Sequence, residues 1–409
     1  MSYSYRGGIL HAEELPLDDI ARRFGTPCYV YSRAAIESAY GEFARALRGR
    51  QSLICYSVKA NSNLAVLALL ARLGAGFDIV SGGELARVLA AGGDPAKTLF
   101  SGVGKSSGEI RFALEKEVGC INVESEAELG RVDQVARGLG RRAPIALRVN
   151  PDIDPKTHPY ISTGLRENKF GVAHGDAERL YQRAAGLKGI EVVGIGCHIG
   201  SLLTEAGPFV AAAERLALLV ERLQKLGIQL KHIDVGGGIG IRYRDETPEP
   251  VSAFVAGTLS ALGGRPETVV FDPGRSIVGN AGVLLTRVEY VKPGFLVVDA
   301  AMNDLIRPAL YGAWHDVQPV RESAPGETVY DIVGPVCESA DFLAKDRRLA
   351  AVEGDLLAVL SAGAYGMSMS SNYNSRPRAP EVLVDRSTAH LVRRRESVDE
   401  LIAHDRIPA

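Results

Sequence analysis

The sequence predicts an α/β fold, a (β/α)8 barrel followed by a mainly β domain. Eight short apolar runs recur at intervals, as expected of buried parallel strands, and amphipathic segments rich in alanine and leucine lie between them. Eight strand-then-helix units over about 220 residues are typical of this barrel. The predicted strands are 53–59, 76–81, 98–103, 120–124, 145–150, 192–201, 232–236 and 268–272. The helical patterns are 63–73, 83–91, 126–137 and 207–226.

An open doubly wound sheet is the competing architecture. It usually carries a glycine fingerprint after its first strand, but here Lys59-Ala60-Asn61 occupies that place. The sequence therefore favours the barrel.

From about residue 280 the rhythm changes to strand-like runs with little helix between them. These runs are 281–291, 295–299, 328–333, 356–360 and 381–384. Near the amino terminus, Leu17–Phe24 has a helical pattern that Gly25 closes. We expect a barrel domain at 33–279 and a β-sandwich or barrel-like domain built from 1–32 and 280–409.

Composition points to small-molecule chemistry. Hydrophobic residues make up 46% and charged residues 23%, and Lys+Arg 47 stand against Asp+Glu 49. This balance offers no basic surface for nucleic acid or an anionic membrane. No apolar run reaches the roughly 20 residues that span a bilayer, and no signal-peptide pattern begins the chain, so a cytoplasmic location is expected.

The five cysteines show no metal-ligand spacing, and we expect no metal site. Cys28, Cys55, Cys120 and Cys197 lie in apolar runs and are expected to be reduced core residues. Cys337 lies where a strand-like run meets a polar loop, and it alone suggests a function.

In a parallel barrel the active site lies at the carboxyl ends of the strands. Lys59 ends the first run, where a desolvated amine can form a Schiff base with an aldehyde. The alternative is a lysine that extends to the surface. Further polar residues stand at other strand ends, namely Asp78, His198, Ser201, Gly237, Gly238, Asp272, Gly274 and Arg275.

The glycines Gly236-Gly237-Gly238 follow the seventh strand, where barrel enzymes often bind phosphate. A lysine for a carbonyl and a phosphate cradle together describe pyridoxal 5'-phosphate as the ligand. Asp272 is suited to pair with its pyridinium nitrogen, the alternative being a loop cap before Pro273.

Several motifs run in the same order across nearly the whole chain as in the diaminopimelate decarboxylase family, which the sequence resembles. They are Tyr56-Ser57-Val58-Lys59-Ala60-Asn61, His198-Ile199-Gly200-Ser201, Gly236-Gly237-Gly238, Asp272-Pro273-Gly274-Arg275, Arg307-Pro308-Ala309-Leu310-Tyr311, Cys337-Glu338-Ser339, Ala364-Tyr365-Gly366 and Ser371-Asn372-Tyr373-Asn374-Ser375-Arg376-Pro377. One departure is Asp272, because the family motif usually begins with glutamate.

The resemblance implies a fold-type III, alanine-racemase-like decarboxylase of meso-diaminopimelate, acting in the last step of lysine biosynthesis. It also implies a homodimer with active sites at the interface. Lys59 and Cys337 are the implied catalytic residues, Cys337 as the proton donor. The implied cofactor ligands are Lys59, Asp78, His198, Ser201, Gly237, Gly238, Asp272, Gly274, Arg275, Tyr365 and Tyr373. The implied substrate ligands are Arg275, Arg307, Tyr311, Glu338 and Tyr373. Which tyrosine meets the phosphate stays open.

Two alternatives remain at this stage. A related decarboxylase of ornithine, arginine or carboxynorspermidine shares the barrel residues but needs no grip for a distal carboxylate, which Arg307 and Tyr311 are suited to provide. A non-catalytic pyridoxal-phosphate-binding protein is expected to be a shorter, bare barrel. Lys105 and the runs Arg347-Arg348 and Arg393-Arg394-Arg395 are expected on solvated faces.

Overall fold

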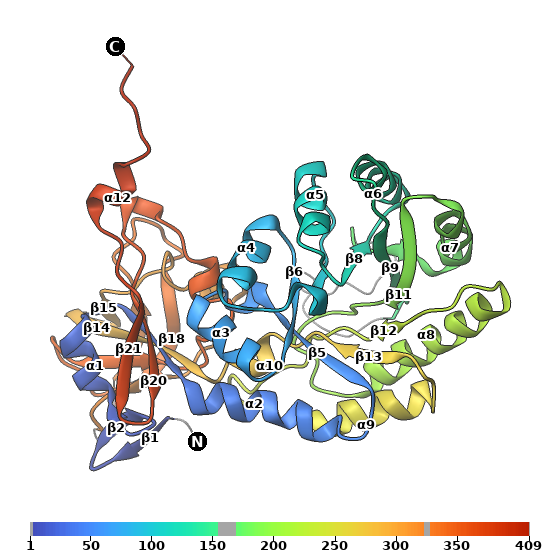
Figure 1. Cartoon of the computed structure of the whole chain (residues 1–409). Coiled ribbons are helices and arrows are strands. Elements are labelled where there is room, and N and C mark those ends of the chain that lie inside the picture. Colours follow the sequence, from blue (N-terminus) through green and yellow to red (C-terminus); the bar gives the residue numbers. More distant parts are fainter. Residues whose placement is uncertain (1–2, 154–168, 323–327, 409) are drawn as a thin grey trace. The chain divides into compact units, whose positions relative to one another are not determined.

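The chain folds into two compact units, which the computed structural model describes over residues 3–153, 169–322 and 328–408 (Figure 1). One unit comprises Tyr40–Ile241 and Thr247–Ser276. The other comprises Met1–Ala39, Arg242–Glu246 and Ile277–Ala409, so a five-residue segment from within the barrel sequence belongs to the second unit.

The first unit is a closed barrel of eight parallel strands. They are β5 (Ser52–Ser57), β6 (Gly76–Ile79), β7 (Thr98–Phe100), β8 (Cys120–Val123), β9 (Ala143–Asn150), β11 (Ile190–Gly196), β12 (His232–Asp234) and β13 (Thr268–Phe271). The sheet runs β9-β11-β12-β13-β5-β6-β7-β8, and pairing of β8 with β9 closes it. The short strand β10 (Val172–Ala173) adds to β9. All eight strands predicted from apolar runs are confirmed.

Helices follow the strands and lie around them in Figure 1. They are α2 (Arg33–Ala46), α3 (Leu64–Arg72), α4 (Gly82–Ala90), α5 (Ser107–Glu115), α6 (Glu126–Gly138), α7 (Ala177–Gly186), α8 (Gly207–Lys225), α9 (Val251–Leu262) and the single turn α10 (Arg275–Val278). Several begin at a side-chain cap: Ser81, Ser106 and Ser125 accept the backbone N–H three residues on, and Asn63 the one two residues on. Such caps fix where each loop at the strand ends stops and its helix begins.

The barrel interior contains small apolar side chains and thiols. Cys55, Cys120 and Ala146 form one buried cluster with side chains of β7, β11 and β13. Cys28, Cys55, Cys120 and Cys197 are free and buried, whereas Cys337 is exposed, as the sequence predicts. Burial raises the pKa of the Cys28 thiol to about 12, so it stays protonated and behaves as a core residue.

The second unit is mainly β. Its large sheet runs β18-β17-β15-β14-β4-β20-β21, with β19 pairing β14 and β16. These strands are β4 (Cys28–Ser32), β14 (Gly282–Lys292), β15 (Phe295–Val298), β16 (Val317–Pro319), β17 (Val329–Val333), β18 (Phe342–Arg348), β19 (Leu356–Val359), β20 (Glu381–Asp385) and β21 (Thr388–Arg393). Because β4 lies between β14 and β20, the amino-terminal segment completes the sheet, as predicted.

Smaller elements complete this unit. A three-stranded sheet contains β1 (Tyr3–Arg6), β2 (Ile9–Ala12) and β3 (Leu15–Pro16), and the helices are α1 (Leu17–Phe24), α11 (Arg307–Tyr311) and α12 (Val398–Ile402). Leu10, Leu17 and Ile20 pack with side chains of β4, β14 and β20 in one apolar core. Within the described ranges, no helix has the length and apolar character needed to cross a membrane.

Lys105 corrects one expectation, because it is buried rather than solvated, with 3% of its surface exposed. Its Nζ donates to the carbonyl oxygens of Gly102 and Asn122 at 2.6 and 2.7 Å and to Oε1 of Glu128 at 2.8 Å. The ammonium thus ties the loop after β7 to β8 and to the first turn of α6. Three acceptors supply the contacts that a buried cation requires.

We predict that Lys105→Met lowers the free energy of unfolding by about 3–5 kcal/mol, because it leaves the Glu128 carboxylate buried without its cation. Adding Glu128→Gln should recover part of this loss. Urea titration of both variants measures the difference, with the exposed Lys116→Met as a control expected within about 0.5 kcal/mol of the parent. A single variant as stable as the parent would contradict the buried pair.

Candidate active site

Lys59 lies one step beyond the strand on which the sequence places it. It is the middle residue of the 3-10 turn Val58–Ala60 that directly follows β5. Its Nζ lies 3.3 Å from Oδ2 of Asp78, which is the third residue of β6. The Asp78 side chain is buried, whereas that of Lys59 is 35% exposed. The amine is therefore held by a buried carboxylate yet remains accessible.

Asp78 is the first member of a polar chain across four neighbouring strands. Ser101, after β7, donates to Oδ1 of Asp78 at 2.5 Å, and Asn122 in β8 donates to the Ser101 hydroxyl at 3.0 Å. The Ser57 hydroxyl is within hydrogen-bond distance of Oδ2 of Asp78 and of the Asp272 carbonyl oxygen. Sequence reasoning missed Ser57, Ser101 and Asn122, although Ser57 and Ser101 stand at the strand ends that it searched.

His198, which follows β11, and Asp272, which follows β13, approach each other. Nδ1 of His198 lies 3.6 Å from Oδ1 of Asp272, and the Gly237 backbone N–H donates to the same Nδ1 at 3.4 Å. At 3.6 Å the contact with Asp272 is too long for a hydrogen bond, so the imidazole gives that oxygen no donor.

Oδ1 of Asp272 is consequently left in need of a donor. It is buried and makes no hydrogen bond to any residue in the described ranges. Leaving a buried carboxylate oxygen unsatisfied costs on the order of 1–3 kcal/mol or more. A cationic N–H donor from a ligand is the group that this position fits.

A second carboxylate lies on β12, the strand next to β13. Asp234, the last residue of β12, is buried, and its Oδ1 accepts the Gly236 N–H at 2.9 Å. Burial, and next the charge of Asp272, raise the pKa of Asp234 well above its ordinary value. The raised pKa favours the neutral, protonated form of Asp234.

The glycine loop Gly236–Gly238 requires the absence of side chains. Gly236 and Gly238 have φ of +82° and +98°, a region that favours glycine. A Cβ on Gly237 would collide with Asp272, and one on Gly238 with the carbonyl oxygen of Gly200 beside Ser201. The loop after β12 therefore passes closely between the loops after β11 and β13.

Gly274 brings the last loop against the lysine turn. A Cβ there would meet Ser57 and Ala60, each 3.0 Å away, and the following residue, Arg275, is only 5% exposed. The structure thus brings together, on one rim of the barrel unit, all of the predicted residues of that unit. These are Lys59, Asp78, His198, Ser201, Gly237, Gly238, Asp272, Gly274 and Arg275.

The remaining predicted residues belong to the second unit. Arg307 and Tyr311 are the first and last residues of α11, and Arg307 is buried. Cys337 and Glu338 follow β17 on an exposed segment, and the Cys337 backbone N–H donates to Oδ1 of Asn374 at 2.9 Å. This bond ties the Cys337 segment to the motif that contains Tyr373.

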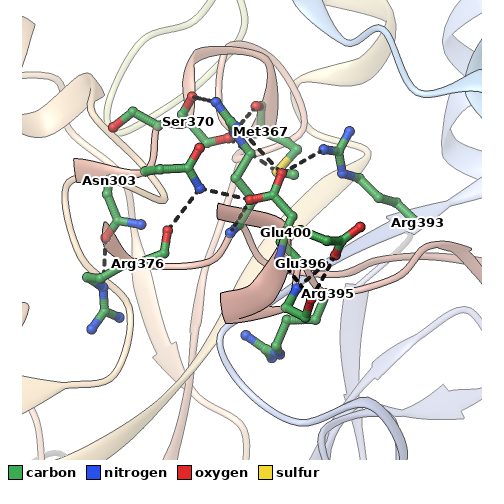
Figure 2. A network of polar contacts seen from close by, with 12 residues as sticks. Asn303, Met367, Ser370, Arg376, Arg393, Arg395, Glu396 and Glu400 are labelled. Carbon is green, nitrogen blue, oxygen red and sulfur yellow. Dashed lines mark hydrogen bonds and ion pairs between the residues drawn. The ribbon is translucent and has the colours of Figure 1, made fainter. Parts of the chain in front are cut away.

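A polar network fixes the motif 371–377 (Figure 2). Arg376 donates to Oδ1 of Asn303 at 3.0 Å, and the Glu396 carboxylate accepts from Asn372 at 2.8 Å and from Arg393 at 3.3 Å. These contacts leave the Tyr373 side chain 45% exposed. Tyr365, on a separate loop, has φ of +56°. The roles of the residues in this unit stay predictions.

Comparisons with known proteins decide the family. Residues 33–279 match the model of the pyridoxal binding domain of pyridoxal-dependent decarboxylases. A Pseudomonas aeruginosa protein named diaminopimelate decarboxylase is 62% identical over 98% of each chain. The chain belongs to the diaminopimelate decarboxylase family.

Solved structures of this family agree. Diaminopimelate decarboxylase from M. jannaschii in co-complex with L-lysine aligns with a TM-score of 0.95 at 36% identity, covering 100% of this chain and 98% of that one. The Helicobacter pylori enzyme complexed with L-lysine aligns with a TM-score of 0.92 at 44% identity, covering 95% and 98%. The predicted family, barrel fold, enzyme class and cofactor are confirmed.

The rim residues fit pyridoxal phosphate, the cofactor of this decarboxylase family. Lys59 offers an accessible amine, Asp272 an unsatisfied buried carboxylate oxygen, and the glycine loop a close backbone surface that a Cβ would obstruct. An aldehyde, a ring nitrogen and a phosphate are the three groups that these features suit.

Proposed function

We propose that this chain decarboxylates meso-2,6-diaminopimelate to L-lysine and CO2, the last step of lysine biosynthesis by the diaminopimelate route. The observation that carries this proposal is the 62% identity over 98% of both chains to a named diaminopimelate decarboxylase. The pairing of Lys59 with Asp78 and the unsatisfied carboxylate oxygen of Asp272 on the barrel rim support this activity chemically.

Lys59 and Asp272 are proposed to hold the two reactive ends of the cofactor. Lys59 Nζ would bind the aldehyde, and Asp78, 3.3 Å away, would orient that amine. Asp272 would hold the proton of the ring nitrogen, and the imidazole of His198 would pack against the ring. When bound, pyridoxal phosphate delocalises the electron pair left by CO2. Ser201, Gly237, Gly238, Gly274, Arg275, Tyr365 and Tyr373 are the further proposed cofactor ligands.

The substrate's second amino acid head is proposed to decide which bond breaks. Decarboxylation would require the bond between Cα and the carboxylate to stand perpendicular to the plane of the cofactor ring, so the far end of the substrate must be held in place. Arg275, Arg307 and Tyr311 suit the distal carboxylate, and Glu338 suits the distal ammonium, with Tyr373 beside them. Cys337 is the proposed donor of the proton that replaces CO2.

Assembly and location are part of the same proposal. A homodimer with active sites at its interface would let Cys337 and Glu338 serve the cofactor of the partner subunit. We also propose the domain limits 33–279 for the barrel, with 1–32 and 280–409 for the β domain, and a cytoplasmic location.

A substrate panel tests the activity directly. Purified holoenzyme should release CO2 from meso-diaminopimelate and form L-lysine, while ornithine, arginine and lysine should react at least about a hundredfold more slowly, because each has a single carboxylate and leaves none for the distal site when that carboxylate is at the cofactor. Release of CO2 from ornithine or arginine at a comparable rate would favour the related decarboxylases. An intact cofactor absorbance band with no product from any substrate would indicate a non-catalytic binding protein.

For Asp272→Asn, we predict a loss of turnover of about a hundredfold or more, because a neutral amide no longer holds the ring proton. Cofactor should still attach at Lys59, so the absorbance of bound cofactor should persist. Asp272→Glu serves as the matched control and should retain most of the activity, since it keeps the charge and restores the residue usual in the family. Unchanged turnover in the Asn variant would remove Asp272 from this role.

A further inference from the structure

Arg307 is held by a group of aromatic side chains within the second unit. Its Nε donates to Nε2 of His315 at 3.4 Å. Its guanidinium carbon lies 5.2 Å from the centroid of the Tyr243 ring and 5.8 Å from that of Tyr311. The side chain is 4% exposed, so a buried cation is placed against ring faces and one imidazole nitrogen.

The protonation of His315 follows from its two hydrogen bonds. His315 is fully buried, and its Nδ1 lies 2.9 Å from the carbonyl oxygen of Leu360. A carbonyl oxygen only accepts, so Nδ1 carries the proton. Nε2 therefore presents a lone pair to the Nε–H of Arg307, and the imidazole that meets both partners is neutral.

His315 is itself fixed from two further sides. The Tyr243 ring packs edge-on against the imidazole, with centroids 5.2 Å apart and planes at 80°. Arg347 in β18 donates from Nη2 to the His315 carbonyl oxygen at 3.0 Å, and its guanidinium stacks on Trp314 at 3.2 Å. The imidazole thus has little freedom to turn.

Arg347 corrects a second expectation, because it is buried rather than solvated. Burial lowers the pKa of its guanidinium to about 10, which leaves it charged at neutral pH. Arg244 stacks on Trp314 as well, at 4.3 Å. The segment 242–246 therefore contributes two neighbouring side chains, Tyr243 and Arg244, to one cluster with Trp314, His315 and Arg347.

We infer that His315 is a positioning residue that sets the guanidinium of Arg307 for the distal carboxylate of the substrate. The inference rests on the proposed function, in which Arg307 binds that carboxylate. The Nε–H is directed at Nε2 of His315, and this bond fixes the plane in which the guanidinium presents its N–H groups to a carboxylate. His315 would thereby favour substrates with a second amino acid head without touching them.

Two variants of His315 separate its hydrogen bonds. In His315→Asn, the amide nitrogen stands near the place of Nδ1 and keeps a donor for Leu360, but no acceptor faces Arg307. In His315→Gln, the amide oxygen stands near the place of Nε2 and keeps that acceptor. The holoenzyme of each variant is titrated with L-lysine, which keeps the distal carboxylate, and with 1,5-diaminopentane, which has none.

We expect His315→Asn to weaken L-lysine binding and raise the KM for meso-diaminopimelate by about tenfold to a hundredfold, the range for one misplaced charged hydrogen bond. Binding of 1,5-diaminopentane and kcat should change by less than about threefold, and His315→Gln should restore most of the L-lysine affinity. In an Arg307→Lys background, His315→Asn should add less than about twofold.

Several results would overturn the inference while leaving the proposed function intact. They are an unchanged L-lysine affinity in His315→Asn, an equal loss for both ligands, or a Gln variant weaker than the Asn variant. If His315→Asn does not fold, Tyr243→Leu removes the ring that contacts both Arg307 and His315 and should give the same selective loss; an equal loss for both ligands there would count against the inference. Failure of the parent protein to convert meso-diaminopimelate would instead contradict the proposed function.

Discussion

Closure of the eight-stranded parallel barrel is the constraint on which the rest of the site depends. Pairing of β8 with β9 and of β13 with β5 makes every strand a neighbour of two others, so all carboxyl ends meet at one rim. Ser57 reaches the carbonyl oxygen of Asp272, 215 residues away in sequence, at 3.0 Å. Without closure, the lysine turn and the loops after β11, β12 and β13 would not share a site.

The charges at this rim are arranged so that each buried carboxylate has a distinct state. Asp78 is satisfied by Lys59 and Ser101, and the raised pKa of Asp234 favours its protonated form. Asp272 alone keeps a buried oxygen that no described residue satisfies by a hydrogen bond. Negative charge is thus concentrated where a ring nitrogen would need it, and binding of such a cation would also stabilise the folded barrel.

Much of the fold could be predicted from the sequence, because buried parallel strands produce apolar runs that local patterns reveal. All eight barrel strands appear at the predicted places, with bounds shifted by a few residues at their ends. The apolar pattern does not predict the strand β18, Phe342–Arg348, because four of its seven residues are charged and three are exposed. Lys59 was placed on a strand, since a single 3-10 turn leaves no periodic signal.

Charged residues that are buried were the main class that sequence reasoning misplaced. In the sequence, Lys105 and Arg347 resemble solvated charges. The tertiary structure gives Lys105 backbone carbonyl oxygens and the Glu128 carboxylate as acceptors, and it stacks Arg347 on Trp314. Tyr243 lies within the barrel sequence but belongs to the second unit, where it packs on His315, and no local pattern encodes this contact. Long-range partners of this kind are set by topology rather than by spacing.

The proposed attachment of the cofactor to the accessible amine of Lys59 can be measured directly. Borohydride reduction of the holoenzyme, followed by proteolysis and mass spectrometry, fixes the cofactor to the amine that binds its aldehyde. We expect the mass of the reduced cofactor on the peptide that contains Lys59, and an unmodified Lys105. Added mass on another lysine, with the Lys59 peptide unmodified, would contradict it.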